Sequence, residues 1–63
     1  MDAMLELISE YKDSGKSLAV ILNGSEALVT VEDIAGSVVK LKQVSGNGIF
    51  YAHYSNIVIS AAQ

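Results

Sequence analysis

The chain of 63 residues contains no cysteine, no proline and no tryptophan, and it has a single histidine, His53. Without cysteine it forms neither a disulfide nor a thiolate metal site, and one histidine cannot build a metal cage by itself. We therefore expect no metal and no other cofactor. The absence of proline means that no position is forced out of a β-sheet. A domain this small and without such supports must gain stability from packing or from association with other chains.

Positive charge is also scarce. The chain has four lysines, no arginine and seven acidic residues, which gives a net charge of −3. A protein that grips nucleic acid mainly by neutralising phosphates normally carries more positive charge, so we do not expect it to bind duplex DNA. A ring of identical subunits would still repeat each lysine or histidine around one axis and so build a local patch.

Long apolar runs are absent as well. No stretch reaches the length needed to span a membrane, and the first residues do not open a signal peptide. We expect a soluble, cytoplasmic protein, located in the host cytoplasm if a phage encodes it, with no membrane partner. Yet 51% of the residues are hydrophobic, more than so small a monomer can hide. This excess predicts a homo-oligomer.

The first segment, residues 1–15, has the spacing of an amphipathic helix. The apolar positions that share one face are Met4, Leu5, Ile8 and Tyr11. Asp2 is suited to the N-cap, and Gly15 to a left-handed residue that ends the helix. Because no second helix is indicated, we expect this one to cover an apolar face of the sheet that follows.

Residues 17–61 have the alternating pattern of short strands. The expected strands are residues 17–22, 27–32, 37–43, 48–53 and 56–61. Asn23-Gly24 tolerates the positive φ of a tight hairpin turn, whereas the short Tyr54-Ser55 joint, which has no glycine, favours a sharp corner between two strands. One helix and five antiparallel strands predict a single mainly β domain, a strongly bent, open SH3-like barrel spanning residues 1–63.

The order of these elements resembles the Sm-like superfamily, which contains the Sm and LSm proteins and the bacterial RNA chaperone Hfq. Leu22-Asn23-Gly24 matches a hydrophobic-Asn-Gly turn between the first two strands of Hfq. Tyr51-Ala52-His53 is similar to its Tyr-Lys-His motif, with Ala52 in place of the lysine. The resemblance covers nearly the whole length and indicates a divergent member, with a phage as a candidate source.

The resemblance implies a ring in which the fourth strand of one subunit pairs with the fifth strand of the next. Neither strand carries the lysine, glutamate or proline that would protect an unpaired edge. Head-to-tail contacts between identical copies close into a ring when the rotation allows it. The expected interface residues are Ile49, Phe50, Tyr51, Ile57, Val58 and Ile59. The number of subunits stays open at five, six or seven.

The same resemblance implies that two loops line the central hole and hold single-stranded RNA. The candidate RNA-binding residues are Asp33, Gly36, His53, Tyr54, Ser55 and Asn56. A base would stack on Tyr54 or His53, and Ser55 and Asn56 would read it through a hydroxyl and an amide.

Two other functions fit the same pattern. In the first, the chain is a structural or assembly module of the same fold, for example in a phage particle, in which the ring is formed but RNA is not bound. Alternatively, a monomeric SH3-like barrel would bind a peptide. We do not expect an enzyme, because the sequence marks out no pair of nucleophile and base.

Overall fold

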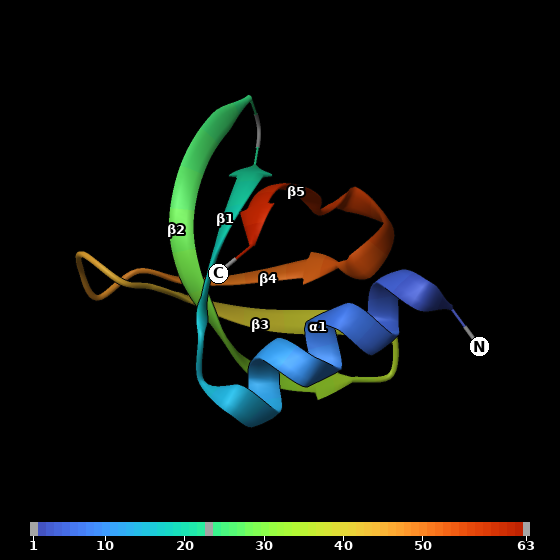
Figure 1. Ribbon diagram of the computed structural model, residues 1–63. Coiled ribbons are helices and arrows are strands. Elements are labelled where there is room, and N and C mark those ends of the chain that lie inside the picture. Colours follow the sequence, from blue (N-terminus) through green and yellow to red (C-terminus); the bar gives the residue numbers. More distant parts are fainter. Residues whose placement is uncertain (1, 23, 63) are drawn as a thin grey trace.

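The computed structural model describes residues 2–22 and 24–62 (Figure 1). The elements follow in the order α1 (Ala3–Ser14), β1 (Ser17–Leu22), β2 (Ser25–Ala35), β3 (Val38–Gln43), β4 (Ile49–His53), the short 3-10 helix η1 (Tyr54–Asn56) and β5 (Val58–Ala62). The strands form one antiparallel sheet in the order β4-β3-β2-β1-β5. The predicted fold class, an N-terminal helix followed by five antiparallel strands in a bent, open sheet, is confirmed.

Both ends of α1 are capped as the sequence predicts. The backbone N–H of Met4 donates to the Asp2 carboxylate at 2.9 Å, which satisfies one of the donors left free at a helix N-terminus. Gly15 adopts φ 72°, and its N–H donates to the carbonyl of Tyr11 at 3.0 Å. A left-handed residue stops the helix there, so α1 cannot run into β1.

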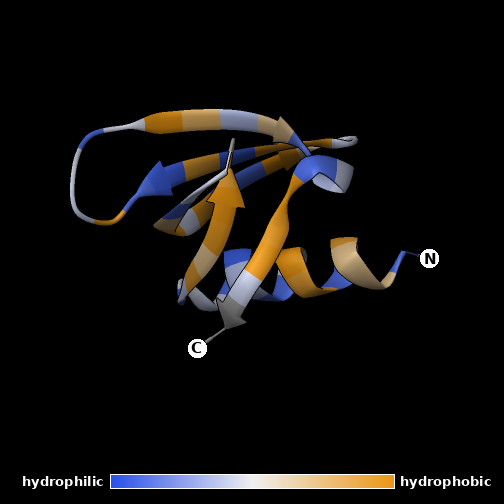
Figure 2. Ribbon diagram, turned by 90° about the horizontal axis from the view of Figure 1, so that it is seen from above, coloured by the Kyte–Doolittle hydropathy of each residue, from blue (hydrophilic) through white to orange (hydrophobic). Residues whose placement is uncertain are grey.

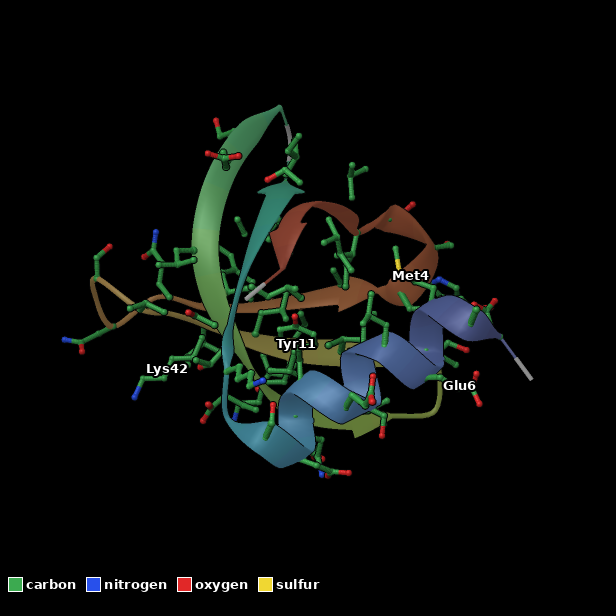
Figure 3. All side chains as sticks on the ribbon, in the orientation of Figure 1. Met4, Glu6, Tyr11 and Lys42 are labelled. Carbon is green, nitrogen blue, oxygen red and sulfur yellow. The ribbon has the colours of Figure 1, made fainter. Side chains whose placement is uncertain are left out.

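The apolar face of α1 covers one side of the sheet. Ile8 is fully buried, and Met4 and Tyr11 pack against the same core. Figure 3 shows Met4 and Tyr11 directed toward the sheet, whereas Glu6 points away from it. Along the helix, hydrophobic and hydrophilic residues alternate in Figure 2 as expected of a helix with one face in contact with a sheet.

The core consists of side chains from alternate strand positions. Its buried members are Ile8, Leu18, Val20, Val29, Val31, Val39, Leu41 and Ile57. Because successive side chains of a strand point to opposite faces, each of β1, β2 and β3 gives two of these residues to the interior. At the outward position after Leu41, Lys42 points away from the barrel in Figure 3.

β2 is longer than predicted, because it continues to Ala35 instead of ending at residue 32. The register with β3 shifts between Val31 and Asp33, which is the mark of a β-bulge. The bulge absorbs one extra residue, so the ladder resumes with Asp33 opposite Lys40. The prediction that Asp33 lies in a loop is therefore wrong, and the turn is limited to residues 36–37, where Gly36 has φ 62°.

The corner between β4 and β5 also differs in detail from the prediction. Tyr54–Asn56 forms a 3-10 helix, closed by the N–H of Ile57 donating to the carbonyl of Tyr54 at 3.3 Å. β5 therefore begins at Val58, two residues later than predicted. Ile57 itself is 3% exposed and belongs to the core. Its side chain is therefore buried within the protomer, and the prediction that it lies at the interface with a neighbouring subunit is wrong.

Candidate functional site

β4 and β5 are the two edge strands of the open sheet. Within the described residues, β4 pairs only with β3 and β5 pairs only with β1, so the two strands lie at opposite ends of the strand order. The prediction that the fourth and fifth strands lie at open edges is confirmed. An edge strand presents a row of backbone N–H and C=O groups on which another chain can pair.

The register of β4 identifies which backbone groups face the open side. The N–H of Gln43 donates to the carbonyl of Gly48 at 2.9 Å, and the N–H of Tyr54 donates to that of Ser37 at 2.9 Å. In an antiparallel ladder, opposite residues alternate between pairs that exchange hydrogen bonds and pairs that do not. Counting between these two bonds, Phe50 and Ala52 bond to β3. The residues whose backbone groups point outward are Ile49, Tyr51 and His53.

The side chains along these edges are mostly apolar and exposed. Tyr51 is 68% exposed and Val58 is 55% exposed, and Ile49 and Phe50 are exposed as well. Ile59 is partly buried against the core. Among the six predicted interface residues, the structure thus leaves four at the surface, one partly covered and Ile57 inside the protomer.

His53 lies where β4 ends, and its ring is held by the turn that follows. The backbone N–H of Ser55 donates to Nδ1 of His53 at 3.1 Å, and the Ser55 Oγ lies 2.7 Å from the same nitrogen. The His53 ring stacks on that of Tyr54, with centroids 4.9 Å apart and 24° between the planes. His53 therefore acts as the N-cap of η1 while its side chain remains exposed.

Tyr54 is occupied within the protomer. Its ring is half-buried and packs against the core. A hydrogen bond to the Asp2 carboxylate, together with the negative charge of Asp2, raises the pKa of Tyr54 above its ordinary value. Asp2 thus joins the N-terminus of α1 to η1. Of the stacked pair, His53 is therefore the exposed ring and Tyr54 the one held by the protomer.

The other predicted site residues divide into two groups. Ser55 and Asn56 lie beside His53 on η1 and are exposed. The bond from Tyr54 to Ser37 also brings the turn containing Gly36 next to this corner. Asp33 lies in the β2–β3 ladder opposite Lys40 and is not part of the cluster.

A hollow of about 600 Å³ lies beside His53. The side chains around it that carry aromatic or polar groups are Ser25, Glu26, Gln43, Phe50, Tyr51, His53 and Asn56. This mixture offers ring faces and hydrogen-bonding groups, and Glu26 contributes negative charge. Sequence reasoning did not predict that Glu26 and Gln43 approach the site, because strands distant in the chain bring them there.

The contact between Ser55 and His53 was also missed from the sequence. A serine two residues after a histidine at a strand end is the only local signal for it. A hydroxyl at 2.7 Å from an imidazole nitrogen resembles a nucleophile and its base. Here the same nitrogen also accepts a hydrogen bond from the backbone N–H of Ser55. The contact between the two side chains is therefore part of the N-cap of η1.

No protein-family model, curated protein or solved structure matches the chain. No helix in the part of the chain that the structure describes is both long enough and apolar enough to cross a membrane. Within residues 2–22 and 24–62, the His, Asp and Glu side chains form no group of three that could hold a metal ion.

Proposed function

We propose that the chain is an Sm-like protein that assembles into a closed homo-oligomeric ring and binds single-stranded RNA at the corner carrying His53, Ser55 and Asn56. The sheet order is the observation that carries this proposal. It leaves β4 and β5 unpaired on their outer sides within one protomer. Pairing the β4 edge of one copy with the β5 edge of the next satisfies both, and such a head-to-tail contact closes when the rotation allows.

The chemistry of the two edges supports this pairing. The β4 edge combines three outward-facing backbone positions, at Ile49, Tyr51 and His53, with exposed apolar side chains. The β5 edge exposes Val58. Antiparallel pairing would bury these side chains together and continue the sheet from one copy to the next. Association would thereby supply apolar burial that a domain of 63 residues lacks by itself.

The RNA part of the proposal depends on the corner between β4 and β5. His53 offers a ring face and a ring N–H, and Ser55 and Asn56 offer polar groups at the same exposed turn. Stacking and hydrogen bonding suit the unpaired bases of single-stranded RNA. With a net charge of −3, the chain would gain little from phosphate contacts, so the affinity should be modest and should change little with salt.

A second candidate is an assembly module of the same ring that does not bind RNA. The net negative charge and the presence of Glu26 in the hollow beside His53 favour it. In that case the ring itself is the function, for example as a component of a phage particle.

Light scattering and a titration with RNA test both candidates. We expect a particle mass that is a whole multiple, between five and seven, of the 6.7 kDa chain. Fluorescence anisotropy with short oligouridine and oligoadenosine, at two salt concentrations, then measures binding. His53→Ala should weaken it, and Asn47→Ala, at an exposed position in the β3–β4 turn, is the matched control. A monomer mass at all concentrations refutes the ring, and an intact ring that binds neither oligomer leaves the assembly module.

A further inference from the structure

We propose that Ser55 is a positioning residue that holds His53 in one tautomer, so that Nε2–H is presented as a donor to an oxygen atom of the RNA. This inference rests on the proposed function and names the chemistry that the same corner would recognise. It concerns two side chains, His53 and Ser55, whose contact the structure gives at atomic detail.

Two groups of Ser55, its backbone N–H and its hydroxyl, together favour one protonation of the ring. The backbone N–H points at Nδ1 of His53 from 3.1 Å, and a backbone N–H can only donate. This geometry favours the form in which Nδ1 carries its lone pair and no hydrogen. In a neutral imidazole the hydrogen then resides on Nε2. The Ser55 Oγ, at 2.7 Å from Nδ1, acts as a second donor to the same nitrogen.

The surroundings also fix the orientation of the ring. One face of His53 stacks on Tyr54, which is itself held by the core and by Asp2. Because Nδ1 is bound to the turn, Nε2 on the far side of the ring points away from η1. His53 is exposed and lines the hollow that also contains Asn56 and Tyr51. The Nε2–H donor thus belongs to an exposed ring at the border of this hollow.

An imidazole held in this way keeps Nε2 as a hydrogen-bond donor, because the two ring nitrogens no longer exchange their donor and acceptor roles. An unrestrained neutral imidazole exchanges its two tautomers, so each ring nitrogen acts as a donor for part of the time and as an acceptor for the rest. Once Nδ1 is engaged, only an acceptor pairs well with the remaining nitrogen. In RNA the suitable acceptors are carbonyl oxygens of bases and oxygens of the backbone phosphate.

Nitrogen-15 NMR tests the role of Ser55 without any RNA. Because the chain has a single histidine, its imidazole gives one unambiguous pattern of long-range couplings. At a pH where the nitrogen-15 shifts themselves show a neutral ring, we expect the Nε2–H tautomer alone in the wild-type chain. Ser55→Ala keeps the backbone bond of 3.1 Å but loses the shorter hydroxyl bond of 2.7 Å, so the Nε2–H tautomer should be less strongly favoured and the second tautomer should become detectable, and Ser55→Thr should restore the single tautomer. A mixture in the wild type, or no change in Ser55→Ala, overturns the assignment.

Binding to oligouridine tests the donor itself. His53→Phe keeps a stacking ring without a donor and should weaken binding about 3- to 10-fold, the value of one hydrogen bond. His53→Gln places an N–H near the position of Nε2 and should retain more of the affinity. Ser55→Ala should fall between the wild type and His53→Phe. Unchanged affinity in His53→Phe refutes the donor role.

An abasic oligomer of the same length identifies the oxygen. If His53→Phe weakens its binding by the same factor as that of oligouridine, the acceptor is in the backbone. A loss confined to oligouridine assigns the acceptor to the base. Light scattering of each variant must show the same particle as the wild type. If the wild-type ring binds no RNA, the proposed function and the RNA oxygen are both refuted, while the NMR pattern still decides the role of Ser55.

Discussion

Replacing Tyr51 with proline should separate assembly from folding. The backbone N–H of Tyr51 faces the open side of β4, so proline at this position removes no bond to β3. Proline is tolerated on edge strands for this reason. We expect the free energy of unfolding of the single subunit to change by about 1 kcal/mol or less, because only an exposed side chain is lost.

The contact between subunits should weaken far more. In the proposed ring, Tyr51→Pro would remove one intersubunit hydrogen bond, worth about 1 kcal/mol, and would leave a carbonyl of the neighbour unpaired at a further cost of about 1–3 kcal/mol. A loss of about 2–4 kcal/mol corresponds to roughly 30- to 1,000-fold weaker association at every contact. Because each subunit of a ring makes this contact on both sides, the particle should dissociate at concentrations where the wild type is intact.

Light scattering over a range of concentrations measures the association of subunits, and circular dichroism during urea unfolding at high dilution measures the free energy of unfolding of the single subunit. Tyr51→Ala is the matched control, because it loses the same side chain but keeps the N–H. Phe50→Pro is the converse control, since its N–H bonds to β3 and its loss should unfold the subunit. The reasoning is refuted if Tyr51→Pro retains the full particle mass, or if it unfolds the chain as Phe50→Pro does.

Three further predictions concern the protomer. Leu41→Ala leaves a cavity at a fully buried position and should lower the free energy of unfolding, measured by urea titration, by about 2–5 kcal/mol. A loss under about 1 kcal/mol would show that Leu41 is not in the core. Gly36→Ala meets no neighbouring atom and should lose only about 1 kcal/mol, from its positive φ, with Gly36→Asn losing less. The bond between Tyr54 and Asp2 should stabilise the fold below pH about 10 and be lost as the pH rises through the raised pKa of Tyr54. The absorbance of the Tyr54 tyrosinate is obtained by subtracting the titration of a chain that carries Tyr54→Phe. In Asp2→Ala this absorbance should appear at lower pH than in the wild type, and an unchanged titration would contradict the contact.

The regular parts of the fold were predictable because they depend on local patterns. The caps of α1 at Asp2 and Gly15 are chemical requirements of a helix end, and they were placed correctly. In the third strand, alternation of apolar residues with Lys40 and Lys42 indicates that Val39 and Leu41 point inward, and both are fully buried. Such signals need no knowledge of the partners across the sheet.

The errors lie where a residue's conformation depends on its partner strand. Nothing local in the sequence at Asp33 indicates that β3 will continue the ladder past a bulge, so the strand was ended too early. Ile57 has the composition of a strand residue, but the 3-10 turn directs its side chain into the core. The contact of Ser55 with His53 and the engagement of Tyr54 by Asp2 likewise follow from the shape of this corner.

The bulge in β2 has a consequence for the size of any ring. β2 spans 11 residues and changes direction where its register with β3 shifts, so one strand carries much of the curvature between the β4 and β5 borders (Figure 1). In a cyclic arrangement, the angle between those borders sets how far each copy is turned relative to its neighbour. The subunit count would then be decided by the geometry at Val31 and Asp33, far along the sheet from the strands that touch.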